Sequence, residues 1–318
     1  MHYLITGGCG FIGSHLSEAL LKQGHRVTVL DDLSTGKISN IEHLESDERF
    51  RMLVGSVTDR QLVYEAVHGC DRVFHLASAV GVRLIMERPV ETIDTIVTGT
   101  QVVLEQANRY RKPLLLTSTS EVYGKSTAVP FEEDGDRLEG PTTKHRWAYA
   151  CAKALDEFLA MAYWKSSNLP VVVARLFNTV GPRQTGQYGM VIPNFVAQAL
   201  TGDPLVIHGD GGQSRCFCHV LDVVQGLVDL MDCPEARGQV VNIGSTEEIT
   251  IRELAGKVVE ITGSSSEIKQ VSYESVYGVG FEDMQRRVPN IAKVGRLIGW
   301  KPSRSLTDIL QAVAKEMS

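Results

Sequence analysis

Tyr149 and Lys153 are the two residues of this sequence whose types and spacing could most directly do chemistry. They lie in a stretch that is expected to be helical, where a spacing of four residues places the phenol and the ammonium on one face. A tyrosine with its ordinary pKa of about 10 is a poor base at neutral pH, but a neighbouring ammonium stabilises the phenolate and lowers that pKa. The phenolate could then take a proton from a substrate hydroxyl. Because this spacing is common in helices, the interpretation depends on its context.

A second group of reactive side chains follows the apolar run at 114–117, in the segment 118–124 (S-T-S-E-V-Y-G). Ligands of parallel sheets bind at the carboxyl ends of the strands. Thr119 could therefore hydrogen-bond a reacting oxygen, and Glu121 could act as an acid, a base or an electrostatic guide, with Ser120 between them. The alternative is a Ser/Thr-rich turn with a solvated glutamate.

The first loop of the chain has the spacing G-x-x-G-x-x-G, with glycines at Gly7, Gly10 and Gly13. It follows an expected strand and leads into an expected helix, with Phe11 and Ile12 at the junction. A tight turn in this position lets backbone N–H groups approach a pyrophosphate at the N-terminus of the helix. The loop therefore predicts a dinucleotide-binding site.

The next expected strand, at 26–30, ends in Asp31 and Asp32. A carboxylate at this place can bind both ribose hydroxyls of an adenosine and would repel a 2′-phosphate, which favours NAD over NADP. The alternative is that the carboxylate only caps a turn. With an oxidised nicotinamide beside them, Tyr149 and Lys153 could remove a proton while a hydride leaves the same carbon.

The elements that must position these residues alternate strictly between strand and helix. This order predicts an α/β fold with a Rossmann-type, doubly wound parallel sheet. We expect residues 1–177, with a return segment near 218–245, to bind the cofactor, and residues 178–318 to form most of a smaller mixed α/β unit for the substrate. The expected strands are 3–6, 26–30, 72–76, 114–117 and 171–176, and the expected helices are 14–23, 61–67, 99–110 and 148–164.

In this order, the glycine loop, the T-S-E turn and the Tyr/Lys pair resemble the extended short-chain dehydrogenase/reductase family, which epimerises, dehydrates or decarboxylates nucleotide sugars. The resemblance continues through H-L-A at 75–77, R-L-F-N at 175–178, G-P-R at 181–183 and the tail at 283–289. Two positions depart from the family: Ser56 and Ile96 stand where it often has Asp and Asn, which puts an adenine contact and a supporting hydrogen bond in doubt.

The resemblance implies a role for each matching residue. Gly7, Gly10 and Gly13 would hold the pyrophosphate, Asp31 the adenosine ribose, Lys153 the nicotinamide ribose, Tyr149 would be the base, Thr119 would contact the sugar, and Asn178, Arg215 and Arg287 would contact the nucleotide diphosphate. Two guanidinium groups suit a diphosphate, although either arginine could instead be a surface residue.

The resemblance leaves the reaction open between a decarboxylase and a 4-epimerase, both of which begin by oxidising C4 of the sugar. The T-S-E at 119–121 is similar to that of UDP-glucuronate decarboxylases, and Arg146, Trp147 and Arg287 are similar to the decarboxylase domain of the enzyme that makes UDP-4-amino-arabinose precursors. G-P-R-Q at 181–184 is equally typical of 4-epimerases, whereas Ser120 counts against a 4,6-dehydratase. UDP-glucuronic acid suits both leading alternatives. A non-catalytic NAD-sensing module stays open as a different class, which the retained Tyr/Lys pair disfavours.

The composition narrows the partners. The chain has 318 residues, a net charge of −6 and no basic block, so nucleic acid is not an expected partner. Its six cysteines are scattered without the spacing of a metal site, so we expect reduced thiols and no metal. The first residues run directly into a strand and no run reaches about 20 apolar residues, so we expect a cytoplasmic protein without leader or membrane span. The helices at 99–110 and 148–164 have apolar residues beyond one stripe, and family members pair these helices, so we expect a homodimer.

Overall fold

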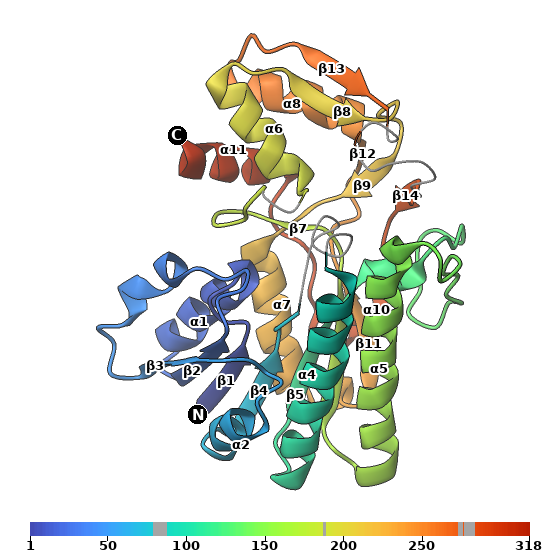
Figure 1. Cartoon of the computed structure of the whole chain (residues 1–318). Helices are drawn as coiled ribbons and strands as arrows, with labels where there is room; N and C mark the ends of the chain where they lie inside the picture. The colour runs from blue at the N-terminus through green and yellow to red at the C-terminus, as the bar shows by residue number, and fades with distance from the viewer. Residues whose placement is uncertain (79–87, 187–188, 273–275, 277–283) are drawn as a thin grey trace.

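The structure is a computed structural model and describes residues 1–78, 88–186, 189–272, 276 and 284–318 (Figure 1). Its centre is a seven-stranded parallel sheet with the order β11-β6-β5-β4-β1-β2-β3. The order reverses between β1 and β4, which is the switch point where ligands of doubly wound sheets bind. The strands are β1 His2–Thr6, β2 Arg26–Asp31, β3 Phe50–Val54, β4 Arg72–His75, β5 Leu114–Thr119, β6 Val171–Leu176 and β11 Gln239–Ile243.

Successive residues of each central strand enter opposite hydrophobic cores. Tyr3 and Ile5 of β1 belong to the core under α1 and α7, whereas Leu4 belongs to the core under α2, α4 and α5. A strand buried on both faces needs apolar residues at nearly every position, which is why these strands are continuous apolar runs in the sequence. The fold class predicted from the sequence is therefore confirmed. The covering helices are α1 Phe11–Lys22, α2 Arg60–His68, α4 Pro89–Arg109, α5 Ala148–Ser167, α7 Val220–Asp232 and α10 Ala292–Ile298.

A smaller mixed α/β unit lies at the carboxyl end of this sheet, at the top of Figure 1. Leu205, Ile207, Leu254 and Ile309 are fully buried members of its own apolar core. Its helices are α6 Val191–Thr201, α8 Ile251–Thr262 and α11 Leu306–Met317. Its strands form three small sheets: β8 Leu205–His208 with β13 Ile268–Val271, β7 Thr179–Val180 with β10 Cys218–His219, and β9 Ser214–Cys216 between β12 Glu248–Thr250 and β14 Arg286–Arg287. The short 3₁₀ helices among the described residues are η1 Ile38–Asn40, η2 Glu42–Leu44, η3 Ser120–Tyr123, η4 His145–Trp147 and η5 Pro234–Ala236.

Several element boundaries differ from the sequence prediction. The helix expected at 99–110 begins at Pro89, because proline suits the first helical position while the β-branched residues that follow weaken the helical pattern. The strand expected at 114–117 continues to Thr119, and β3 was not predicted at all. Within the expected return segment, α7 packs against α1 and β11 pairs with β6. The division of labour between a cofactor unit and a substrate unit stays a prediction.

Two smaller expectations concern the surface and the thiols. None of the helices in the described part of the chain has both the length and the apolar character to cross a membrane. All six cysteines are free, five are buried, and Cys151 on α5 is exposed.

Candidate active site

A cavity of about 820 Å³ is lined by residues at the carboxyl ends of the central strands and by residues of the smaller unit. Its size lies within the range of pockets that enclose organic ligands, roughly 300–1,000 Å³. Every site residue predicted from the sequence lines it: Gly7, Gly10, Phe11, Ile12, Gly13, Asp31, Thr119, Ser120, Glu121, Tyr149, Lys153, Asn178, Arg215 and Arg287. Residues from both halves of the chain therefore meet in one place, although the role of each stays a prediction.

The backbone of the glycine loop is packed so closely that Gly7 and Gly13 have no space for a Cβ. Because these positions carry no side chains, an anion can approach the backbone N–H groups of the loop. Gly7 has a φ of +71°, and a Cβ there would lie 2.8 Å from the backbone nitrogen of Ala77. A Cβ on Gly13 would lie 2.3 Å from the carbonyl oxygen of Gly7. Gly10 precedes α1 and has no side chain to cap it, while the first N–H groups of any helix lack intrahelical partners. This end of α1 can therefore donate to a pyrophosphate.

Asp31 sits at the end of β2 with its carboxylate fixed in place. Its Oδ2 accepts a hydrogen bond from the Cys9 N–H at 2.9 Å, and its Oδ1 accepts one from the Leu33 N–H at 2.9 Å. Burial raises the pKa of this carboxyl, while the two backbone donors oppose the rise. The turn-capping role considered for this residue is therefore present, and each oxygen keeps a further lone pair that could accept from a ribose hydroxyl.

Tyr149 and Lys153 are both buried on α5, which places them beside the end of β5. Burial raises the pKa of Tyr149 and the charge of Glu121 raises it further, whereas hydrogen bonds with the hydroxyls of Ser78 and Thr119 lower it. Ile96, one of the two departures from the family pattern, is 1% exposed and packs in an apolar cluster with Tyr149. Tyr149 therefore needs added positive charge before it can act as a base.

Glu121 is held between two arginines from distant segments of the chain. Its Oε1 lies 2.6 Å from Nη2 of Arg287 on β14, and its Oε2 lies 3.0 Å from Nη2 of Arg146 on η4. Burial by itself would raise the pKa of Glu121, but the guanidinium groups of Arg287, Arg146 and Arg215 outweigh it and lower the pKa to about 2. The alternative of a solvated glutamate is wrong, since only 13% of this side chain is exposed.

The local turn that presents Glu121 follows from the residue before it. Thr119 ends β5 and its Oγ1 accepts a hydrogen bond from the Glu121 N–H at 3.2 Å, which starts the 3₁₀ helix η3. Ser120 turns inward and is only 1% exposed.

The residues expected to contact a diphosphate also lie together. Arg215 and Arg287 are register partners on the parallel strands β9 and β14, and both are buried, so the alternative that they are surface residues is wrong. Nη1 of Arg287 donates to Oδ1 of Asn178 at 3.4 Å, and Nδ2 of Asn178 donates to the Cys216 carbonyl at 2.9 Å. Strand pairing therefore brings the two arginines side by side, and the hydrogen bond to Asn178 helps to fix the guanidinium group of Arg287.

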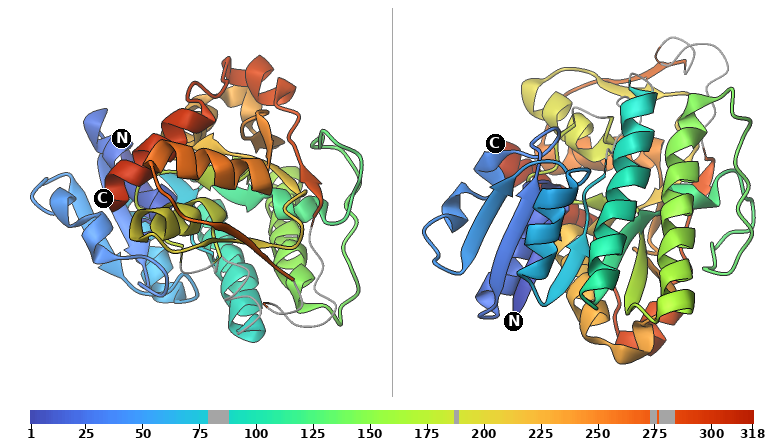
Figure 2. Two further views of the ribbon diagram at one scale, coloured as in Figure 1. Left: turned by 90° about the horizontal axis from the view of Figure 1, so that it is seen from above. Right: turned by 60° about the horizontal axis from the view of Figure 1, so that its bottom comes forward.

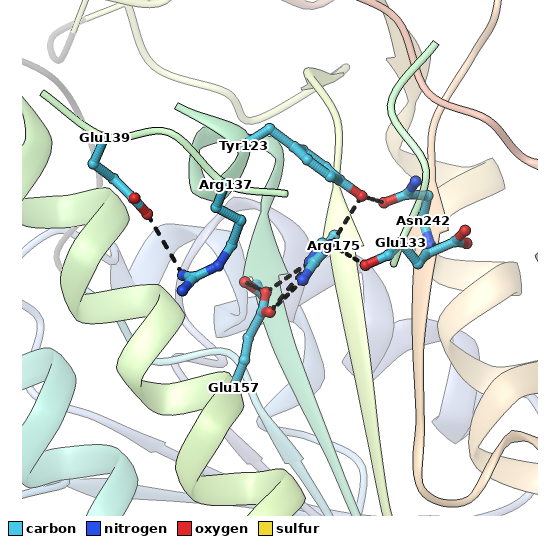
Figure 3. A network of polar contacts seen from close by, with 8 residues as sticks. Tyr123, Glu133, Arg137, Glu139, Glu157, Arg175 and Asn242 are labelled. Atoms are coloured by element: carbon cyan, nitrogen blue, oxygen red, sulfur yellow. Dashed lines mark hydrogen bonds and ion pairs between the residues drawn. The ribbon is translucent and has the colours of Figure 1, made fainter. Parts of the chain in front are cut away.

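A polar network that the sequence analysis did not predict includes Tyr123, at the end of the 3₁₀ helix η3 (Figure 3). Nη2 and Nε of Arg175 on β6 lie 2.7 and 3.0 Å from the two carboxylate oxygens of Glu157 on α5. Nη1 of Arg175 donates to the Tyr123 hydroxyl at 3.0 Å, which in turn donates to Oδ1 of Asn242 at 2.8 Å. Ser118 also donates to Glu157. A charged residue inside an apolar strand was the signal that could have predicted a buried partner.

The other departure from the family pattern lies away from these side chains. The Oγ of Ser56 lies 2.8 Å from Oγ1 of Thr58 and also accepts from the Thr58 N–H at 3.2 Å. Ser56 therefore serves a local turn.

Comparison with known proteins gives consistent matches over nearly the whole chain. Residues 4–313 match the family model described as GDP-mannose 4,6 dehydratase. The chain is 44% identical over 303 residues to the UDP-N-acetyl-alpha-D-glucosaminuronate decarboxylase of Bacillus cytotoxicus, covering 95% of this chain and 93% of that protein. It is 39% identical over 299 residues to UDP-glucuronic acid decarboxylase 1 of Xenopus tropicalis, covering 94% of this chain and 68% of that protein.

A solved structure adds a comparison from a different reaction. The UDP-glucuronic acid 4-epimerase of Bacillus cereus, in complex with UDP-glucuronic acid and NAD, matches with a TM-score of 0.89 and 29% identity, covering 100% of this chain and 99% of that one. Decarboxylases and epimerases therefore share this architecture, and the choice between them rests on the residues around the reacting sugar.

Proposed function

The chain belongs to the extended short-chain dehydrogenase/reductase family of nucleotide-sugar enzymes, and from that premise we propose that it decarboxylates a UDP-linked hexuronic acid with NAD as its cofactor. The observation that carries the proposal is the ionised Glu121 between Arg146 and Arg287, beside Thr119 and Tyr149. Two relatives that match most of this chain act on uronic acids by their names.

The residues of the glycine loop and Asp31 suit NAD in shape and charge. Gly7 and Gly13 clear the approach to the N-terminus of α1, and the fixed carboxylate of Asp31 accepts from ribose hydroxyls and repels a 2′-phosphate. When bound, NAD⁺ supplies the hydride acceptor for oxidation of the sugar at C4. Lys153 donates to the nicotinamide ribose, and Tyr149 takes the proton of the C4 hydroxyl.

Once C4 is a ketone, the carboxylate on C5 belongs to a β-keto acid. The C5–carboxylate bond breaks, carbon dioxide leaves, and the electron pair passes through C5 to the C4 oxygen as an enolate. Tyr149, now protonated, donates a hydrogen bond to that oxygen, and Thr119, which hydrogen-bonds with Tyr149, would do the same. A proton from solvent then adds to C5 in place of the lost carboxylate. The bound cofactor would give its hydride back to C4, and Tyr149 gives its proton back to the C4 oxygen.

Glu121 favours this outcome over epimerisation for an electrostatic reason. Arg146 and Arg287 can orient the substrate carboxylate, and the ionised Glu121 offsets part of their positive charge, so the carboxylate is held less firmly than two unpaired guanidinium groups would hold it and its loss as neutral carbon dioxide is opposed less. The guanidinium groups of Arg146 and Arg287 keep Glu121 ionised, as its lowered pKa of about 2 indicates. A 4-epimerase must retain the same carboxylate and gains nothing from an anion there. Arg215, Arg287 and Asn178 bind the diphosphate of the substrate.

The test is the mass of the product after incubation with NAD⁺ and either UDP-glucuronic acid or its 2-acetamido analogue, since the relatives differ in this substituent. A product lighter by carbon dioxide supports the proposal, and the better substrate identifies the group at C2. A product of unchanged mass and altered retention identifies a 4-epimerase instead, and loss of water identifies a dehydratase. Binding of NAD without any turnover identifies the non-catalytic module.

The assembly belongs to the proposal as well, and we infer a homodimer formed through α4 and α5. These two helices pack side by side on the outside of the sheet (Figure 2, right). Leu155 and Phe158, three residues apart on one face of α5, are 51% and 63% exposed, and an exposed apolar patch can mark a protein–protein interface. A Phe158→Glu variant should be monomeric by light scattering, and a wild-type chain that is already monomeric would contradict the inference.

A further inference from the structure

Behind the catalytic pair lies a chain of buried hydrogen bonds that ends at Asp156, one turn after Lys153 on α5. Nζ of Lys153 lies 3.0 Å from Oδ2 of Asp156, and the side chains are 3% and 1% exposed. The hydroxyl of Thr100 on α4 donates to the same Oδ2 at 2.8 Å. Two donors on one carboxylate oxygen fix the side chain of Asp156 against both helices.

The direction of every proton in this chain can be worked out. The Thr100 hydroxyl has one hydrogen and donates it to Asp156, so it accepts from Nε2 of His75, 3.0 Å away. His75 therefore carries its proton on Nε2, and its Nδ1 accepts from the Thr6 hydroxyl at 2.7 Å. Burial lowers the pKa of His75 to about 3, and the charge of Lys153 acts in the same direction, so the ring is neutral.

The far end of the chain reaches the glycine loop. Oγ1 of Thr6 accepts from the Ala77 N–H at 3.3 Å, and this is the nitrogen that a Cβ on Gly7 would touch. Each group in this series therefore donates toward Asp156. The carboxylate of Asp156 accepts from both Thr100 and Lys153. A neutral residue at 156 would leave the ammonium of Lys153 buried without this counter-charge.

We propose that Asp156 is a positioning residue that holds Lys153 in place and offsets part of its charge, so that Tyr149 becomes a base only when a second positive charge, that of the oxidised nicotinamide, is added. The proposal rests on the proposed roles of Tyr149 and Lys153. An ammonium paired at 3.0 Å stabilises a neighbouring phenolate less than an unpaired one does.

The other groups around Tyr149 do not supply that charge. Glu121 on η3 raises the pKa of the phenol, and its own pairing with Arg146 and Arg287 leaves those guanidinium groups partly neutralised. From β5 and the end of β4 come the hydroxyls of Thr119 and Ser78, which are uncharged.

The remaining neighbours act from α4, β4 and α5. Ile96 and Thr100 on α4 carry no charge, and the ring of His75 on β4 is neutral. Burial raises the pKa of Asp156 and the charge of Glu157 raises it further, while Lys153 and the Thr100 hydroxyl lower it. The charge of Asp156 raises the pKa of Tyr149 as well, though less than that of Glu121, and its ion pair offsets the charge of Lys153.

The experiment titrates the phenolate of Tyr149 by ultraviolet difference absorbance in the NAD⁺-loaded protein, with a Tyr149→Phe variant as the blank. In the Asp156→Asn variant the midpoint should fall by about one pH unit, the lower end of the effect of one nearby charge. The acid limb of the kcat/KM profile should move to lower pH by the same amount. A midpoint that stays or rises overturns the proposal.

Further variants separate charge from packing. Asp156→Glu restores the charge and should return the midpoint toward the wild-type value. Glu157→Gln removes the neighbouring buried carboxylate, which pairs with Arg175, and should cost stability without moving the midpoint. If Asp156→Asn fails to fold, Asp156→Ser, which is smaller and equally uncharged, takes its place and should lower the midpoint by a similar amount, and no shift overturns the proposal.

The absorbance titration needs no turnover. A shifted midpoint in a protein that forms no decarboxylated product would contradict the proposed reaction and leave the inference about Asp156 standing. An unshifted midpoint in a protein that does decarboxylate its substrate would support the proposed reaction and contradict the inference about Asp156.

Discussion

Replacing Glu121 with glutamine keeps the size of the side chain and removes the charge that holds Arg146 and Arg287. The pKa of this carboxyl falls from its ordinary value of 4.5 to about 2 in the folded protein, which corresponds to about 3 kcal/mol in favour of the ionised form. The side chain is 13% exposed, so solvent screens the pair little. Removing one partner of a buried ion pair costs roughly 3–5 kcal/mol, and we expect a loss near the lower end of that range.

The assay is the free energy of unfolding in urea for the wild type and Glu121→Gln, measured as a function of pH. Because the folded pKa is depressed, the carboxylate contributes its full stabilisation above the unfolded value near 4.5 and loses it as the pH falls toward 2. The difference between the two proteins should therefore be constant at neutral pH and shrink below about pH 4.5.

A matched control is Glu105→Gln, which breaks an ion pair of similar length on the surface. Glu105 lies 2.6 Å from Arg60, and these side chains are 46% and 58% exposed. This change should cost less than about 1 kcal/mol. Equal losses for the two variants, or a Glu121→Gln difference that does not shrink in acid, would refute the reasoning about the buried cluster.

Three further predictions concern the cofactor site and the base. Gly13→Ala places a Cβ 2.3 Å from the Gly7 carbonyl oxygen and should weaken NAD binding at least about tenfold by calorimetry. Gly256→Ala on α8, with open space around its Cβ, should bind normally and gain up to about 1 kcal/mol of stability, and equal binding by both variants would be contrary to the loop model. Asp31→Asn should lower the affinity for NAD and bring it closer to the affinity for NADP. An unchanged ratio of the NAD affinity to the NADP affinity would argue against the ribose contact. Tyr149→Phe should still bind NAD, but its rate of product formation should fall by about 100-fold or more. Full turnover by this variant would contradict the role of Tyr149 as the base.

Local features of this protein could be predicted from the sequence because short-range physics determines them. The glycine loop needs residues without a Cβ, and the spacing of Tyr149 and Lys153 follows from one turn of helix. The buried strands are recognisable as continuous apolar runs, and their alternation with helices predicts a doubly wound sheet. The cofactor side of the cavity therefore followed from segments that are contiguous in the chain.

The substrate side depended on contacts between segments that lie far apart. Glu121 is recognisable as a carboxylate in a turn, but its neighbours Arg146 and Arg287 come from other elements, and only their arrival makes it a buried anion. Asp156 looks like an ordinary helical carboxylate until α4 brings Thr100 against it. Charge pairing in a low-dielectric interior depends on distance in space, which spacing along the chain does not encode. The sequence alone determined the fold, the glycine loop and the spacing of Tyr149 and Lys153, whereas the tertiary structure decided which charges surround them, and the proposed reaction rests on those charges.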